Sequence, residues 1–564
     1  MHFSEMAYKR PDFDKLEEVF REKLSVFNDA PDFSVQLKII REFNNLREDA
    51  ETAMSLARIH QSIDTRDKFY DEESVFLDQN SPRYQALIDE YYRAITGSRF
   101  RIDLEKNLGK RLFDLAESAL KTFRPEIMDD LAEENRLSTE YMKLLASAQI
   151  DFDGKKLNLS GLGPYKESPD RETRRLASEA YFGFMSQNRA KLDSIYGSLV
   201  RVRDRIAVKL GFKNFIPLAY LRMSRLDYDQ DMVKNYRDSI YKNIVPAANR
   251  LRERQKSRLG LDHLYYYDLP FRFRTGNPRP VGNPGQIISS GRKMYHELSS
   301  ETAGFIDRML SDGLMDLETR PGKSGGGYCS WIPKYKAPFI FSNFNGTSGD
   351  VDVLTHEAGH AFQAHMSSGF QVPEYVWPTM ESAEIHSMSM EFITWPWMES
   401  FFGADADKYR FMHLTEAFLF VPYGALVDDF QHAVYENPSF TPEQRFKAWR
   451  DLEKKYLPYR DFAGNAYLEE GGFWQCQRHI YESPFYYIDY TLAQICAIQY
   501  WNKFRENREK AWEDYLNLCR AGGSAPFLEL VKTGGLESPF ESGVLEKCIE
   551  PAVKWMDEKS DSII

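Results

Sequence analysis

The chain has 564 residues, of which 42% are hydrophobic and 28% charged, and this composition is typical of a globular protein large enough for several cores. Its formal net charge of −12 argues against a general nucleic-acid or anionic-membrane binder, because such proteins present basic patches. The five cysteines lack paired metal-binding spacing, and no apolar run approaches about 18 residues. We therefore expect a cytoplasmic protein with reduced thiols and no membrane span.

The first 150 residues predict a series of amphipathic helices, because apolar side chains recur at three- and four-residue spacing. One helix is expected to open at Pro11-Asp12-Phe13 and to run to about Asn28. A second is expected over Asp32–Ile63, and a third from about Pro82 to Ile95. Long helices joined by short polar turns are typical of an elongated helical lobe.

Turn and helix signals follow one another in the next part of the chain. Alternating side chains around an Asp-Gly pair predict a β-hairpin over Ile150–Leu159. A helix is then expected to begin with Ser168 as its N-cap and Pro169 in its first turn. Helical character continues to about Asp316, apart from an extended proline-rich loop at residues 268–286.

Two short apolar runs, Tyr328–Ile332 and Pro338–Phe344, follow a glycine-rich turn. They predict a small β-sheet directly before the segment that carries the strongest motif of the chain. The edge strand of such a sheet is either a purely structural element or a surface that binds an extended peptide by backbone pairing. The sequence leaves both interpretations open.

The strongest motif is His-Glu-Ala-Gly-His at residues 356–360. His356 and His360 lie four residues apart, so on a helix their imidazoles point the same way and can bind one metal ion. Glu357 is near enough to act on a water molecule at that ion. Asp352 is one further step along the same face, where it is either the hydrogen-bond partner of a ligating imidazole or an ordinary helix charge.

A catalytic zinc ion takes three protein ligands and keeps one position open, so a third donor is required. His365 is a poor candidate because five residues after His360 is about 140° from the ligand face. The other candidates form an acidic stripe on a predicted helix, at Glu381, Glu384, Ser387 and Glu391. Three acids on one stripe are costly to bury unless they serve a cation, although a solvated acidic face is the alternative.

The motif together with Glu384, 24 residues after the second histidine, resembles the thimet oligopeptidase family, and in particular its oligoendopeptidase F and Pz-peptidase branch. Three other segments resemble the same branch: Ser168–Arg174, Asn343–Gly346 and His479–Tyr490. The likeness therefore extends over roughly residues 150–560.

This resemblance implies one zinc ion per chain, held by His356, His360 and Glu384, with Glu357 as general base. It also implies a mostly α-helical, two-lobed, elongated body with a small β-sheet beside the HExxH helix and an active site in a deep channel between the lobes. The corresponding division of the chain is an N-terminal helical lobe (1–150), a helical segment (151–320) and a catalytic region (321–564).

A cluster of tyrosines follows His479 near the C-terminus. By its pattern alone, the cluster is an aromatic helix face packed into a core. The resemblance gives His479 and neighbouring tyrosines a sharper role, because imidazole and phenol groups stabilise the oxyanion formed in peptide hydrolysis. The assignment among Tyr486, Tyr487 and Tyr490 stays open. Tyr487 and Tyr490 are preferred because they keep the three-residue step of the family pattern.

The predicted function is a cytoplasmic, zinc-dependent endopeptidase that hydrolyses internal bonds of short unfolded oligopeptides, with no nucleic-acid or membrane partner. One alternative is a zinc metallocarboxypeptidase of similar helical shape, which needs a basic residue to hold the substrate carboxylate. The other is a non-catalytic peptide-binding protein. Structural zinc normally takes four protein ligands, and Glu357 would then have no role.

Overall fold

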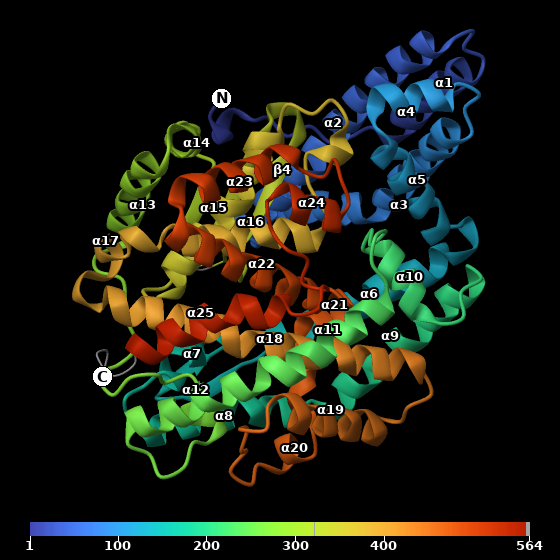
Figure 1. The fold of residues 1–564 in the computed structure, drawn as a ribbon. Helices are drawn as coiled ribbons and strands as arrows, with labels where there is room; N and C mark the ends of the chain where they lie inside the picture. The colour runs from blue at the N-terminus through green and yellow to red at the C-terminus, as the bar shows by residue number, and fades with distance from the viewer. Residues whose placement is uncertain (321, 560–564) are drawn as a thin grey trace.

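A computed structural model describes residues 1–320 and 322–559 of the chain, and α-helices make up most of it (Figure 1). The described strands form one sheet of two strands and one of three. Within these ranges, no helix is both long enough and apolar enough to cross a lipid bilayer. The expectation of a mostly α-helical, elongated multi-helix body with a small sheet is confirmed.

The N-terminal helices pack around a hydrophobic core built largely from residues 13–116. Asp12 and Asp32 cap the first two helices by accepting backbone N–H bonds, which confirms the predicted starts. The predicted start of the third helix was wrong. Asp67 caps it, and Pro82 lies inside it. The helices are α1 (Phe13–Asn28), α2 (Phe33–Ile63), α3 (Lys68–Thr96), α4 (Arg101–Leu108) and α5 (Lys110–Thr122).

The predicted hairpin is present as strands β1 (Ile150–Phe152) and β2 (Lys155–Leu157), which pair antiparallel. Asp153 and Gly154 connect them with φ values of 51° and 69°. Both values lie in the left-handed region that two-residue hairpin turns require, and aspartate and glycine adopt it more readily than most residues.

The helix after the hairpin begins two residues later than predicted. Asp170, not Ser168, is the N-cap, because its carboxylate accepts the Thr173 N–H at 2.8 Å. The helices of this part are α6 (Met128–Ala146), α7 (Gly163–Lys166), α8 (Arg171–Gln187), α9 (Arg189–Lys209), α10 (Phe215–Arg222), α11 (Gln230–Asn243), α12 (Val245–Leu259), α13 (Pro284–Leu298) and α14 (Ser300–Ser311).

The three-stranded sheet contains both predicted strands, β4 (Tyr328–Ile332) and β5 (Ala337–Phe344). A third strand, β3 (Met315–Glu318), was missed because helical character was expected to reach Asp316. The strand order is β3-β5-β4, with β5 parallel to β3 and antiparallel to β4. Strand β4 is therefore at an edge of the sheet.

The helix that carries the His-Glu-Ala-Gly-His motif, α15 (Gly349–Ser367), packs on β4 and β5 and against α16 (Met380–Ile393). Asp350 in its first turn accepts the N–H groups of Asn345 and Gly346 and so ties the preceding loop to the helix. Helix α16 in turn packs on α22 (Tyr487–Glu506). Residues far apart in the sequence thus meet where α15, α16 and α22 lie together.

The remaining helices complete the body around this assembly. They are α17 (Glu399–Phe402), α18 (Ala406–Glu436), α19 (Pro442–Tyr456), α20 (Ala466–Glu469), α21 (Arg478–Glu482), α23 (Arg508–Ala521), α24 (Phe527–Thr533) and α25 (Val544–Lys559). In Figure 1, α15, α16 and the small sheet lie in the upper half of the molecule, α8, α9, α12 and α19 lie in the lower half, and α22 runs between the two halves.

Candidate metal centre

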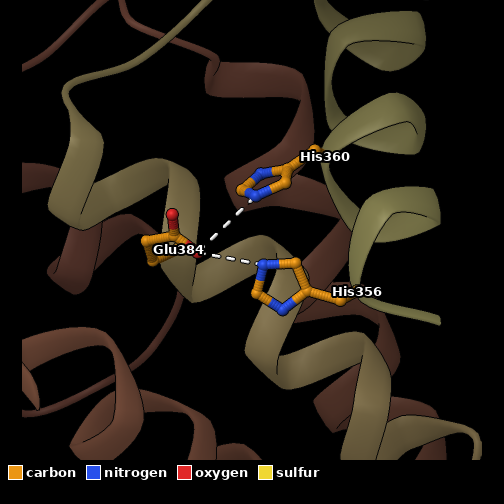
Figure 2. Close-up of side chains that lie close together, drawn as sticks. All are labelled: His356, His360 and Glu384. Atoms are coloured by element: carbon orange, nitrogen blue, oxygen red, sulfur yellow. Dashed lines mark ion pairs between the residues drawn. The ribbon is translucent and has the colours of Figure 1, made fainter. Parts of the chain in front are cut away.

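Helices α15 and α16 bring His356, His360 and Glu384 together (Figure 2). Glu384 Oε2 lies 3.3 Å from His356 Nε2 and 3.5 Å from His360 Nε2. One possible ligand atom from each residue falls within 4.8 Å of the others. The acidic stripe of α16 is not a solvated face, because Glu381 and Glu384 are both buried, and Glu384 is the member that faces both imidazoles.

The charge of Glu384 is stabilised by its neighbours. Burial opposes ionisation, but the imidazoles of His360 and His356 outweigh it and hold the pKa of Glu384 well below its usual range. Two imidazole nitrogens and one carboxylate oxygen are the donor set of a catalytic zinc site that keeps one coordination position open. The residues present therefore fit such an ion.

Glu357 is only 7% exposed and borders the start of β4. Two observations show how close its carboxylate is to this strand. A Cβ atom at Gly327 would lie 3.6 Å from Glu357 Oε1. Burial raises the pKa of the Cys329 thiol, and the negative charge of Glu357 raises it further. Burial raises the pKa of Glu357, while the two histidines lower it. A carboxylate whose pKa is raised toward neutrality is a better proton acceptor than an exposed one.

A relay of hydrogen bonds sets the tautomer of His356. Trp395 Nε1–H donates to His413 Nδ1 at 3.2 Å, and an indole only donates, so the His413 proton is on Nε2. That nitrogen donates to Glu391 Oε2 at 2.6 Å, and the other oxygen of Glu391 accepts from His356 Nδ1 at 2.7 Å. With Nδ1 bound to Glu391, His356 turns Nε2 toward Glu384, and Nε2 is the nitrogen whose lone pair a metal ion at this place would take.

Of the two interpretations that the sequence left open for Asp352, the partner of a ligating imidazole is the wrong one. Asp352 accepts a hydrogen bond from the Tyr409 hydroxyl at 2.5 Å, and Glu391 is the carboxylate that contacts His356. Helix spacing alone placed Asp352 on the correct face, but α18 supplies a tyrosine at that point. The sequence did show Glu391 on the acidic stripe, without showing which imidazole it meets.

The other histidines of this region lie apart from the metal centre. His365 contacts Phe305 and lies 3.5 Å from an Arg308 nitrogen, so it is not part of the ligand group. His386 is fully buried on α16, and burial lowers its pKa to about 4. The placement of His365 agrees with the interpretation from helix geometry.

The C-terminal tyrosine cluster reaches the same centre through Tyr486, the N-cap residue of α22. The Tyr486 hydroxyl donates to Glu384 Oε1 at 2.7 Å, which is the oxygen that does not face the histidines. The His479 ring lies 5.5 Å from Tyr486, 5.0 Å from Tyr487 and 5.8 Å from Tyr490, measured between ring centroids. The structure thus singles out Tyr486, one of the three candidates that the sequence left open, as the tyrosine in contact with Glu384. Tyr487 and Tyr490 lie beside His479, and Tyr487 also packs on Phe420 and Tyr423.

Comparison with known proteins accounts for this arrangement. Residues 3–123 match the peptidase M3 N-terminal domain, and residues 289–549 match peptidase family M3. A solved structure of a putative oligoendopeptidase F is 54% identical, with a TM-score of 0.97 over all of both chains. The chain belongs to peptidase family M3.

Two further relatives of this M3 peptidase support the assignment. Pz peptidase A, solved with an inhibitor, is 53% identical, with a TM-score of 0.96 over 99% of each chain. The oligoendopeptidase F homolog of Borreliella burgdorferi is 23% identical over 458 residues, which are 78% of this chain and 73% of that protein. The protein is therefore a metalloendopeptidase, as the motif predicted.

The glycine of the motif allows the M3 peptidase to bring α15 close to α16. A Cβ atom at Gly359 would lie 2.6 Å from both His386 O and Ser387 Cα. Gly359→Ala is therefore expected to push the helices apart, lowering stability by about 1–3 kcal/mol and weakening metal binding. Thermal unfolding and metal titration test this, with Gly369→Ala as control because nothing lies within 4 Å of its Cβ position. Equal effects of the two substitutions would contradict the explanation.

The relay through Glu391 predicts a second effect in the M3 peptidase. Burial opposes ionisation of Glu391, but hydrogen bonds from His356 and His413 lower its pKa to about 2. A Glu391→Gln amide cannot accept from both imidazoles, so metal affinity is expected to fall about 10- to 100-fold. Competition with a chelator measures this affinity. Glu172→Gln, at an exposed ion pair with Arg175, is the control that should leave it unchanged.

Proposed function

We propose that this metalloendopeptidase is zinc-dependent and hydrolyses internal bonds of short, unfolded oligopeptides in the cytosol. The observation that carries the proposal is the convergence of His356, His360 and Glu384 beside the buried carboxylate of Glu357. Three donors with an adjacent acid suit a hydrolytic site better than a structural one, because structural zinc normally has four protein ligands.

His356, His360 and Glu384 would hold the zinc ion. When bound, zinc supplies a Lewis acid that polarises a carbonyl group and lowers the pKa of a water molecule. The relay from Trp395 to His356 and the hydrogen bond from Tyr486 to Glu384 keep these donor atoms oriented.

Glu357 is assigned the proton transfers of the reaction. Its carboxylate accepts a proton from the water that attacks the scissile carbonyl carbon, and then delivers that proton to the nitrogen of the departing amine. The carbon–nitrogen bond breaks, and the products are a carboxylic acid and an amine, which are present near pH 7 as a carboxylate and an ammonium group. The burial that raises the pKa of Glu357 supports this shuttle, because the same group must take up and release a proton.

His479, Tyr487 and Tyr490 are assigned to the developing oxyanion. Burial lowers the pKa of His479 to about 4, so the imidazole is neutral near pH 7 and offers one N–H donor. Burial also raises the pKa values of Tyr487 and Tyr490, which keeps both phenols protonated. Protonated phenols in a dry site are effective donors to an oxyanion.

The edge strand β4 supports an extended peptide substrate. It pairs with β5 along one side, and its first residues border Glu357. A substrate paired with the other side of β4 would run past the metal centre in extended form, which requires an unfolded chain. The names of the relatives, oligoendopeptidase F and Pz peptidase, also support short peptides as substrates.

The proposal is tested by incubating the protein with a mixed library of roughly 5–20-residue peptides, with and without a chelator, and identifying the products by mass spectrometry. The expected result is cleavage at internal bonds that the chelator abolishes and Zn²⁺ restores. Release of single residues from the carboxyl end would instead support the carboxypeptidase alternative. Absence of any product from the zinc-loaded protein would support a binding protein.

A further inference from the structure

The residue before Tyr486 has an unusual backbone conformation. Phe485 connects α21 to α22 with a φ of +67°, and its side chain is fully buried. A bulky residue rarely adopts this left-handed conformation, because its Cβ crowds the backbone. Such a conformation persists only where the surroundings hold it in place, and it is often found beside functional groups.

Two buried side chains from other parts of the fold hold the backbone of Phe485. Gln431 on α18 accepts the Phe485 N–H through Oε1 at 2.9 Å. Arg225, three residues after α10, donates to the Phe485 carbonyl at 2.6 Å and also pairs with Asp489 in the first turn of α22. The peptide units on both sides of Phe485 are therefore fixed by groups outside its own loop.

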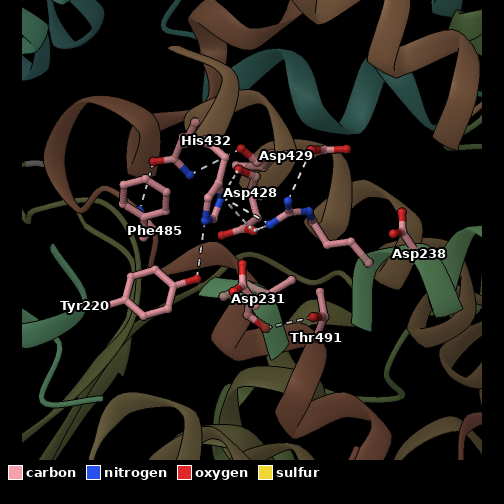
Figure 3. Close-up of polar contacts among 12 residues, drawn as sticks. Tyr220, Asp231, Asp238, Asp428, Asp429, His432, Phe485 and Thr491 are labelled. Carbon is pink, nitrogen blue, oxygen red and sulfur yellow. Dashed lines mark hydrogen bonds and ion pairs between the residues drawn. The ribbon is translucent and has the colours of Figure 1, made fainter. Parts of the chain in front are cut away.

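A buried polar cluster supports the ring of Phe485 (Figure 3). His432 packs edge-on against it, with 4.8 Å between ring centroids. His432 is itself held between the Tyr220 hydroxyl at 3.4 Å and the Asp428 carbonyl at 3.0 Å, and Arg237 pairs with the Asp428 carboxylate. The ring thus packs on a histidine that is itself hydrogen-bonded on two sides, and Tyr220 and Tyr435 also contact it.

The peptide unit that Arg225 holds is the one that joins Phe485 to Tyr486. Its orientation sets the direction of Tyr486, whose hydroxyl reaches Glu384 Oε1. We propose that Phe485, together with Gln431 and Arg225, is a positioning unit that fixes Tyr486 against the metal ligand Glu384. This inference rests on the proposed zinc site, and the unit acts only through Tyr486.

The alternative is that Phe485 merely closes a turn in the hydrophobic core. In that case, weakening its support lowers stability without a specific effect on the metal centre. The positioning role instead predicts that the loss of the Gln431 hydrogen bond and the loss of the Tyr486 hydroxyl have the same consequence. Two groups that act in series give non-additive effects, whereas independent groups give effects that add as free energies.

The test is a double-mutant cycle on zinc affinity, measured by chelator competition with the full-length protein. Gln431→Met keeps the side-chain length and removes the acceptor, and Tyr486→Phe removes the hydroxyl. Each single variant is expected to bind Zn²⁺ about 10-fold or more weakly, within the range for groups that contact a ligand. The double variant is expected to bind no more weakly than Tyr486→Phe alone.

Phe430→Leu is the matched control, because Phe430 is the buried neighbour of Gln431 and packs on Trp449 and Trp474 instead. It should lower the melting temperature and leave zinc affinity unchanged. Unaltered affinity in Gln431→Met, or losses that multiply in the double variant, would overturn the inference. The wild-type protein distinguishes a failure of this inference from a failure of the proposed function. If the wild-type protein binds zinc and cleaves peptides while the variants give one of these contrary results, only the positioning role is refuted.

A second pair of variants tests the backbone conformation if Gln431→Met does not fold. Phe485→Gly and Phe485→Ala both remove the ring, but only glycine adopts positive φ without steric cost. The glycine variant is expected to bind Zn²⁺ several-fold more tightly than the alanine variant. Equal affinities would show that the left-handed backbone does not position Tyr486.

Discussion

Glu357→Gln is expected to lower peptide hydrolysis by about 10²- to 10⁴-fold while zinc remains bound. The amide has nearly the same shape as the carboxylate but cannot accept the proton of the attacking water. Glu357 is not among the three ligand residues, so the donor set of the metal is preserved. The measurements are kcat and KM with a defined peptide, together with the zinc content of the purified variant.

The matched comparison is His360→Ala, which should lose zinc and activity together because it removes one of the three donors. The two variants therefore separate a defect in proton transfer from a defect in metal binding. Undiminished hydrolysis by zinc-loaded Glu357→Gln would refute the assignment of Glu357. Loss of zinc from that variant would instead place Glu357 in the ligand set.

Changing Tyr486, Tyr487 and Tyr490 to phenylalanine one at a time is expected to lower kcat in some variants and zinc affinity in another. A tyrosine that donates to the oxyanion should cost about 10²- to 10³-fold in kcat when changed to phenylalanine, with KM and zinc affinity nearly unchanged. Tyr487→Phe and Tyr490→Phe are expected to behave in this way. Tyr486→Phe is expected mainly to weaken zinc binding, because its hydroxyl contacts Glu384.

The comparison of kcat with zinc affinity decides the assignment that the sequence left open. Tyr241→Phe is a control, because Tyr241 is 47% exposed on α11 and should affect neither quantity. If Tyr486→Phe lowers kcat at saturating zinc as strongly as the other two, Tyr486 belongs with the oxyanion donors. If Tyr487→Phe has no effect, Tyr487 is a packing residue against Tyr423 and Phe420.

Several features that depend on near neighbours in the chain were predicted correctly. The pairing of His356 with His360 follows from helix periodicity, and the β1–β2 hairpin follows from the Asp-Gly turn. Both errors concern helix starts: Ser168 and Asp170 are neighbouring polar residues that competed as caps, whereas Pro82 was taken as the start of a helix that in fact contains it and begins after Asp67. Local signals identify an element more reliably than its first residue, because each capping bond is weak.

The division of the chain into three regions remains a prediction. The structure shows that side chains from residues 13–116 share one hydrophobic core, while α6 packs on α9 in the larger core. Whether any region folds by itself depends on the stability of its separate core. The sequence-based boundaries at residues 150 and 320 therefore still require a test with isolated fragments.

The sequence alone determined the chemistry of this protein: the HExxH helix, the acidic stripe of α16 and the tyrosine cluster are all visible in it. Only the tertiary structure decided how they combine. Helix periodicity left Glu384 as one of several acids on a stripe, and the family resemblance pointed to it; the structure gives the physical reason, because α15 crosses α16 closely at Gly359 and Glu384 is the acid that meets the histidines there. Tyr486 reaches Glu384 because α18 and Arg225 hold Phe485 in a left-handed turn. Helix periodicity places side chains on a face, whereas the packing of helices distant in sequence selects which side chain on that face makes contact.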